Sequence, residues 1–220
     1  MYKFDKIEHF AKFPCMVPFV GQQYSHPRHK KLLVVGESHY LSSESTIHLD
    51  DKEWYSTDQR KLTEKEIGWI DPNEIITYGI DTNFSDKGLK IYHEIAQCLN
   101  DVLFKYQKWH EIIKVIHHIS FINYFQRPAP QGESLDPTEK DIQVSDDVIS
   151  SVIKTLNPDL IAIVSSKSAS YAAPSLVHLK IPYCITPHPA CAWWNRKAKK
   201  YGDRNGYEVL KNFLLTHWIV

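Results

Sequence analysis

Short polar segments follow the apolar runs of this chain, and that arrangement restricts its fold more than any other feature. Residues 36–40 (Gly-Glu-Ser-His-Tyr) follow the run at 32–35, and residues 186–190 (Thr-Pro-His-Pro-Ala) follow a second run. A third run, at 119–122, ends at Asn123. Continuous apolar runs are typical of buried parallel strands, and such sheets bind ligands beyond the carboxyl ends of their strands. The three polar segments are therefore expected to meet in one pocket.

Helical patterns alternate with these runs. Apolar residues recur at helical spacing over 85–99, and a second periodic stretch covers 102–109. Asp136-Pro137-Thr138-Glu139 has the chemistry of a helix start, and the helix that follows must stop at Asn157-Pro158. The remaining elements are strands at 32–35, 119–122, 160–164 and 182–187 and helices at 167–176 and 206–215. This alternation predicts an α/β fold of three layers, α/β/α, with a short, mainly parallel central sheet.

The length of 220 residues fits one domain spanning 1–220. Prolines punctuate the N-terminal arm, and no repeat or low-complexity linker divides the chain. Residues 41–82 are polar and carry scattered tryptophan and tyrosine. We interpret this stretch as an insertion that runs over the edge of the sheet and serves as a lid.

Composition excludes several classes. The 26 basic and 26 acidic residues give a net charge of +0, so any affinity for nucleic acid must come from local patches. The N-terminus has no apolar signal-peptide core, and no stretch approaches a membrane span, so we expect a cytoplasmic protein. The four cysteines show no C-x-x-C spacing, which favours reduced thiols. His117 and His118, expected on a strand, would point to opposite faces and bind no common metal.

The order of the motifs resembles that of the uracil-DNA glycosylase superfamily. Its members carry a Gly-led motif after the first strand, an Asn at the end of a second strand and an H-P-S motif after the last strand. Residues 36–40, Asn123 and residues 188–190 occupy those places here. Residues 123–128, 136–138, 157–161 and 167–169 are similar to successive motifs of the iron–sulfur branch, as is 84–89. The resemblance spans roughly 31–215.

The chain also departs from the family at three positions and combines features of different branches. Gln126 stands where the iron–sulfur branch has a cluster cysteine, so we expect no cofactor. Ser38 takes the place of a water-activating Asp, and Ala190 replaces the serine of H-P-S. Tyr40 falls where one branch has the tyrosine that excludes a 5-methyl group. The chain is thus a mosaic of branch features.

The resemblance implies roles for individual residues. His188 would donate a hydrogen bond to the departing base anion, and Asn123 would read the O4 and N3–H edge of uracil. Phe84 would stack on the extruded base, while Gly36 and Tyr40 complete the base pocket. Glu37, Ser38 or His39 would orient the attacking water. Glu37 is preferred because it alone is anionic.

The segment after the His motif, residues 193–204, carries five cations and three aromatic residues. Such a composition suits a loop that grips phosphates and displaces a base. The residues expected to contact the DNA backbone are Trp193, Arg196, Lys197, Lys199 and Lys200.

These features predict a monomeric DNA glycosylase-like hydrolase that excises uracil or a related damaged base from DNA in base-excision repair. Two alternatives stay open. One is a catalytically silent member of the fold that binds nucleic acid or a nucleotide-like ligand, which Ser38 and Ala190 favour. The other is a hydrolase of free nucleosides, which the basic aromatic loop disfavours.

Overall fold

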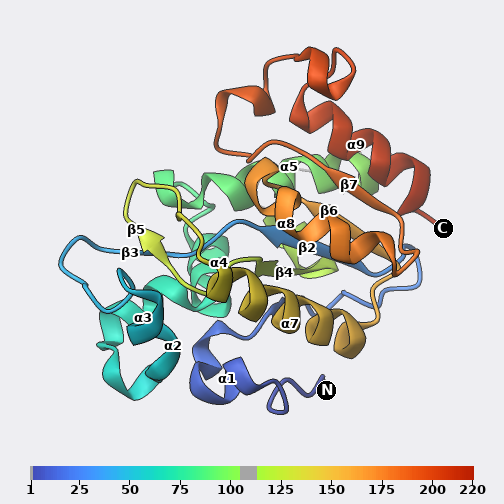
Figure 1. Ribbon diagram of the computed structural model, residues 1–220. Coiled ribbons are helices and arrows are strands. Elements are labelled where there is room, and N and C mark those ends of the chain that lie inside the picture. Colours follow the sequence, from blue (N-terminus) through green and yellow to red (C-terminus); the bar gives the residue numbers. More distant parts are fainter. Residues whose placement is uncertain (1, 105–112) are drawn as a thin grey trace.

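A five-stranded sheet forms the centre of the protein, seen here in a computed structural model that describes residues 2–104 and 113–220 (Figure 1). The strands lie in the order β1-β4-β2-β6-β7. They span Phe19–Val20 (β1), Leu32–Gly36 (β2), Ile119–Asn123 (β4), Leu160–Ile163 (β6) and Tyr183–Ile185 (β7). Each apolar run of the sequence is therefore a strand, and the expected α/β class is confirmed.

The four strands β4, β2, β6 and β7 are parallel, and the short edge strand β1 pairs antiparallel with β4. From β2 the chain crosses first to β4 on one side and later to β6 on the other. The strand order thus reverses at β2, and such a switch point is where open α/β sheets bind ligands. The register pairs Gly36 with Asn123 at the carboxyl ends of β2 and β4.

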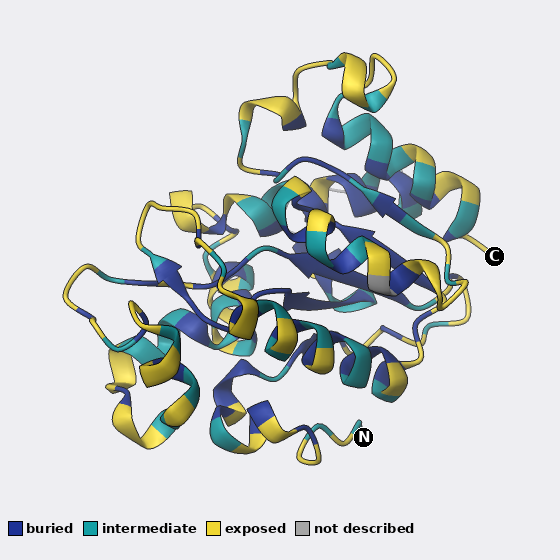
Figure 2. Cartoon of the chain, viewed as in Figure 1, coloured by how far each residue is buried: buried dark blue, intermediate teal, exposed yellow. Residues whose placement is uncertain are grey.

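Helices cover both faces of the sheet, and alternate residues of β2 divide between two apolar cores. Leu33 and Val35 pack with α7 and α8, whereas Leu32 and Val34 pack with α5 and α9. Figure 2 shows the central strands β2, β4 and β6 buried throughout, with exposed residues on the outer helix faces. These helices span Lys90–Leu103 (α5), Glu139–Leu156 (α7), Ser166–Val177 (α8) and Gly206–His217 (α9).

The start of α7 differs from the expected one. Thr138 is the N-cap, and it shares a capping box with Asp141, so the predicted cap at Asp136 was wrong. The Asp141 carboxylate also pairs with the buried Arg127, with 2.6 Å between Oδ2 and Nη2. This pair fixes Asp141 in the first turn, so the helix is capped at Thr138, two residues after Asp136. The predicted end is confirmed: Asn157 adopts a left-handed conformation with φ of 46° immediately before Pro158.

Residues 41–82, predicted only as a polar insertion over the edge of the sheet, are mainly helical, and these helices were not predicted. The helices are α2 (Asp51–Ser56), α3 (Glu64–Ile70) and α4 (Pro72–Asp81), with a 3-10 turn η2 at Gln59–Lys61. Asp50, Thr63 and Asp71 each cap the helix that follows with a side-chain oxygen. These caps explain why so polar a stretch is ordered.

The N-terminal arm contributes α1 (Glu8–Lys12) and a 3-10 turn η1 at Pro14–Met16. His117 and His118 end a 3-10 helix, η4 (Ile113–His118), so their expected placement on a strand was wrong. The predicted helix over 85–99 begins later, at Lys90, after the 3-10 turn η3 (Lys87–Leu89). Of the predicted stretch 102–109, residues 105–109 lie outside the described residues. Across the described ranges, no helix combines the length and apolar character that crossing a membrane requires.

Candidate active site

A cavity of about 590 Å³ opens at the carboxyl ends of the strands. Part of its lining is polar and comes from the segments that follow β2, β4 and β7. These residues are Ser38, His39, Tyr40, Asn123 and His188, and the side chains of Tyr78, Asp86 and Gln131 add further polar groups. The rest of the lining is largely apolar and comes from α3, α4, η3, α5 and β4. Its main residues are Trp69, Ile75, Leu89, Ile91, Tyr92 and Phe121.

The segments after β2 and β4 stay side by side beyond the sheet. Backbone amides of Phe125 and Ala129 donate to the carbonyls of Glu37 and His39 at 2.9 and 2.8 Å. Two short parallel strands, β3 (Tyr40–Leu41) and β5 (Ala129–Pro130), extend this pairing. The pairing holds the Gly-led motif and the Asn motif at a constant separation.

Gly36 has a specific steric role in this arrangement. A Cβ at position 36 would lie 2.2 Å from Oδ1 of Asn123 and 2.8 Å from Cζ of Phe121. Both distances are far below van der Waals contact, so only glycine lets the Asn123 amide occupy its place. The Gly-led motif therefore sets the position of the second motif residue.

Unpartnered polar groups face the cavity. Neither amide atom of Asn123 has a hydrogen-bond partner among the residues that the structure describes, although the residue is only 6 % exposed. The buried Ser38 hydroxyl likewise has no partner within the described part of the chain. Because a buried polar group without a partner is costly, these groups are suited to a ligand or water.

His188 is prepared to donate a hydrogen bond. Its Nδ1 accepts from the Ala190 amide at 3.2 Å, so in the neutral ring the proton is on Nε2. Burial lowers the pKa of His188, and the nearby Glu37 acts in the opposite direction. The net lowering keeps the ring neutral near pH 7, with an Nε2–H that no residue in the described ranges accepts.

Glu37 lies beside this cavity and is not one of its lining residues. Its two carboxylate oxygens accept from the hydroxyls of Ser134 and Ser165, at 2.6 and 2.7 Å. Lys167 in turn donates to Ser134 at 3.1 Å and to the carbonyl of Leu135. Glu37 is thus held as part of a network next to His188.

Sequence reasoning missed Ser134, Ser165 and Lys167 as site residues. A signal existed for Ser165, because it follows Val164 at the end of the apolar run 160–164. The same strand-end rule that selected Asn123 and His188 would have selected Ser165. No comparable signal exists for Ser134, which reaches Glu37 from a distant turn.

Phe84 is not brought to the cavity. It is buried, with φ of 48°, against α4, where a Cβ at Gly79 would lie 2.1 Å from its ring. Its ring packs on Tyr92 at a centroid distance of 6.0 Å. Tyr92 and Phe121, which meet edge to face at 4.9 Å, line the cavity instead. A stacking role for Phe84 stays a prediction.

The basic loop after His188 is mostly exposed (Figure 2). Trp193 is 48 % exposed, whereas Trp194 is buried and donates to Glu94 at 2.9 Å. Arg196, Lys197, Lys199 and Lys200 are all exposed, and Lys197 pairs loosely with Glu208 at 3.8 Å. The loop therefore combines an anchored tryptophan, an exposed one and several accessible cations.

Gln126 lies on the inner side of the turn after β4. Its Nε2 donates to the carbonyls of Asn123 and Tyr124 at 2.8 and 3.1 Å, which fixes the turn that presents Asn123. Of the four cysteines, Cys15, Cys98 and Cys184 are buried free thiols and Cys191 is partly exposed. Among the described residues no group of three or more His, Cys, Asp or Glu side chains is arranged to hold a metal ion.

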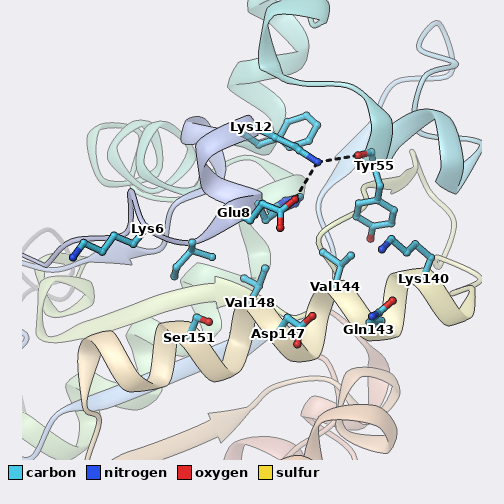
Figure 3. A pocket seen from close by; sticks show the side chains of 13 residues that line it. Lys6, Glu8, Lys12, Tyr55, Lys140, Gln143, Val144, Asp147, Val148 and Ser151 are labelled. Atoms are coloured by element: carbon cyan, nitrogen blue, oxygen red, sulfur yellow. Dashed lines mark hydrogen bonds and ion pairs between the residues drawn. The ribbon is translucent and has the colours of Figure 1, made fainter.

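A second hollow of about 370 Å³ lies between α1 and α7 (Figure 3). Lys12 is neutralised there by Glu8 at 3.5 Å and donates to the carbonyl of Tyr55. Burial lowers the pKa of His9 to about 3, with a smaller contribution from Lys12, so this ring is neutral as well. This groove contains none of the predicted site residues.

No protein-family model matches the chain, and a search of curated proteins likewise found no match. What the fold and site define is an α/β protein with a mixed, mainly parallel sheet and a strand-end cavity.

Proposed function

We propose that this protein is a DNA glycosylase-like hydrolase with a uracil-DNA glycosylase-like α/β/α fold, which cleaves the N-glycosidic bond of uracil or a related damaged base. The observation that carries the proposal is that Asn123 and His188 line one cavity and that each has hydrogen-bonding groups with no partner among the described residues. An amide that both donates and accepts can read a base edge, and a neutral imidazole can donate to a base anion.

The proposed reaction assigns one role to each group. The attacking water bonds to C1′ of the sugar, the bond from C1′ to the base nitrogen breaks, and its electron pair leaves with the base. The Nε2–H of His188 stabilises that anion. Ser38 and His39 orient the water from the cavity wall. Glu37, which lies beside the cavity, accepts the water's proton and stabilises positive charge on the sugar once one of its bonds to Ser134 or Ser165 opens.

A second candidate, the catalytically silent binder, has its own support. The carboxylate of Glu37 is turned toward Ser134 and Ser165, and the cavity wall carries Ser38 where the family has its water-activating Asp. A site without a carboxylate in contact with the ligand would bind a base and not cleave its bond.

Single-turnover assays distinguish the two candidates. The purified protein is incubated with oligonucleotides that carry uracil, hypoxanthine or a thymine mismatch, and alkali-labile sites are measured. We expect excision by the wild-type protein and a loss of about 10²- to 10³-fold in His188→Ala, with DNA affinity nearly unchanged. Asn123→Asp should lose selectivity for uracil, because a carboxylate cannot donate to O4. Absence of excision on every oligonucleotide would favour the silent binder.

The basic loop supports a polymeric substrate. Replacing Arg196, Lys197, Lys199 and Lys200 with Gln should weaken DNA binding for all sequences and lower its salt slope by about one unit per lost phosphate contact. A matched control replaces four exposed lysines elsewhere, Lys3, Lys6, Lys61 and Lys140. Equal effects in both variants would mean that the loop is not the DNA contact.

A further inference from the structure

Two hydroxyls hold Glu37 beside the cavity, and they differ in how firmly each is placed. Ser165 is buried after β6, and its oxygen also accepts from the amides of Lys167 and Ser168 at the start of α8. Ser134 is exposed, on the stretch that connects β5 with α7 (Figure 1). Because exposed connecting segments move more readily than capped helix starts, the bond from Ser134 opens more easily than the bond from Ser165.

We propose that residues 131–135, which we call the latch turn, hold Glu37 away from the cavity and release it when a ligand binds there. Ser134 and Lys167 are the positioning residues that keep the latch turn closed. This inference rests on the proposed function, because it concerns how the Glu37 carboxylate reaches the attacking water.

Lys167 fastens the latch turn at its C-terminal end. Its Nζ donates to Oγ of Ser134 at 3.1 Å and to the carbonyl of Leu135, whose side chain is buried. Ser134 donates in turn to Oε1 of Glu37 at 2.6 Å. One ammonium therefore holds both the hydroxyl that binds Glu37 and the carbonyl that follows it, so loss of this cation would loosen the turn where it meets Glu37.

The other end of the latch turn belongs to the cavity. Gln131 and Gly132 line the cavity, and both are exposed. Gly132 has φ of 83°, and no described atom lies within 4 Å of a Cβ placed there, so open space adjoins the turn. A ligand in the cavity contacts the turn and can bind its closed and open positions with different affinity, which is the condition for shifting it.

Glu37 already acts electrostatically on the cavity lining. Burial raises the pKa of Tyr40, and the Glu37 charge raises it further. Burial lowers the pKa of His188, and the same carboxylate opposes that change. Tyr40 and His188 both line the cavity. Release of Oε1 from Ser134 would therefore present an acceptor for the water's proton near these groups while Oε2 keeps its bond to Ser165.

Single-turnover excision of uracil from an oligonucleotide tests the latch turn. Ser134→Ala should raise the rate about tenfold, the factor that one hydrogen bond to a charged group commonly contributes to an equilibrium, and leave DNA affinity unchanged. Lys167→Met should also raise the rate. Ser134→Thr and Lys167→Arg, which keep the hydroxyl and the cation, should return it toward the wild-type value. In the Glu37→Gln background, Ser134→Ala should give no gain.

Hydrogen exchange of the unliganded protein, followed by mass spectrometry, reports on the latch turn without any reaction. Peptides that cover residues 131–135 should exchange faster in Ser134→Ala and in Lys167→Met than in the wild type. The matched controls are Ser43→Ala and Lys154→Met, which remove an exposed hydroxyl and an exposed ammonium outside the turn. These controls should change neither the excision rate nor the exchange.

The outcomes separate the two proposals. An unchanged or lower excision rate in Ser134→Ala, with excision by the wild type, overturns the latch and leaves the proposed function standing. A gain that persists in the Glu37→Gln background also overturns the latch, because Ser134 would then act through another group. Equal exchange of residues 131–135 in all variants overturns it as well. Faster exchange in Ser134→Ala and Lys167→Met without excision by any variant keeps the latch and removes the glycosylase activity.

Discussion

At Gly36 the backbone of β2 lies against the Asn123 side chain, so a single methyl group matters there. We expect Gly36→Ala to lower the free energy of unfolding by about 1–3 kcal/mol, because the added Cβ would meet Asn123 Oδ1 at 2.2 Å and force it to move. Urea unfolding measures the loss. Gly88→Ala is the control, since nothing lies within 4 Å of a Cβ there. Equal stabilities of the two variants would refute the steric role of Gly36.

The Ser165 hydroxyl makes two kinds of hydrogen bond, one to the start of α8 and one to Glu37. It caps α8 through the amides of Lys167 and Ser168 and also donates to Glu37. Ser165→Gly removes the hydroxyl at a cost to the cap of only a few tenths of a kcal/mol, so most of its effect reports on Glu37.

A double-mutant cycle tests that contact. Glu37→Ala and Ser165→Gly should couple by about 0.5–3 kcal/mol in the free energy of unfolding, and Ser165→Thr should restore the coupling because it keeps the hydroxyl. Ser170→Ala, on the exposed side of α8, should be additive with Glu37→Ala. Additivity at Ser165 would show that the 2.7 Å contact contributes nothing.

At the scale of elements, the start of α7 connects three segments that are distant in sequence. Asp141 accepts from Arg127 on the turn after β4 and from the hydroxyl of Tyr55 on α2. Burial alone would raise the pKa of Asp141, but its bonds to Arg127, Thr138 and Tyr55 outweigh this and lower it. The 41–82 stretch, which supplies one wall of the cavity, is attached to the sheet through this cluster.

We expect Asp141→Asn to lower the free energy of unfolding by about 3–5 kcal/mol, because it leaves the Arg127 guanidinium buried without a counter-charge. Chemical denaturation at pH 7 measures this. Glu44→Gln breaks the exposed pair with Lys65 and should change stability by less than about 1 kcal/mol. If the two substitutions cost the same, the buried pair does not attach this segment.

For the molecule as a whole, several buried histidines make stability depend on pH. Burial lowers the pKa of His39 to about 4 and that of His118 to about 4, the latter helped by His29, His26 and His117. Burial likewise lowers the pKa of His9, to about 3. These groups are neutral when folded and protonate near 6.5 when unfolded. Their stabilising contribution is therefore complete above pH 6.5 and is lost as pH falls toward 4.

Between pH 7.5 and 5.5 we expect a loss on the order of 1 kcal/mol for each of the fully buried His9 and His39. His9→Phe should reduce this loss of stability by the roughly 1 kcal/mol assigned to His9. A phenyl ring fits the site because the His9 ring packs against Phe10, Phe13 and Tyr55. His178→Asn, at an exposed position, should leave it unchanged. Urea unfolding at a series of pH values provides the measurement, and a parallel shift of all three curves would contradict the assignment.

Local pattern was enough to predict the four parallel strands of the sheet and the helices α5, α7, α8 and α9. The apolar runs at 32–35 and 119–122 can be buried only as central strands, and Asn157-Pro158 must end a helix, so neither depends on distant partners. The strand-end rule also predicted that Glu37, Asn123 and His188 share a pocket, and of these three Asn123 and His188 line the cavity whereas Glu37 does not. It did not predict the helices of 41–82, whose short amphipathic faces depend on packing against the rest of the protein.

The sequence by itself determined the α/β class and which residues lie at the carboxyl ends of the strands. Only the tertiary structure decided which of them meet. Glu37 turns to Ser134 and Ser165, which lie 97 and 128 residues away in the sequence. Phe84 packs on Tyr92 across a turn whose backbone conformation depends on packing. Contacts of that range are set by how the layers pack and leave no periodic signal in the chain.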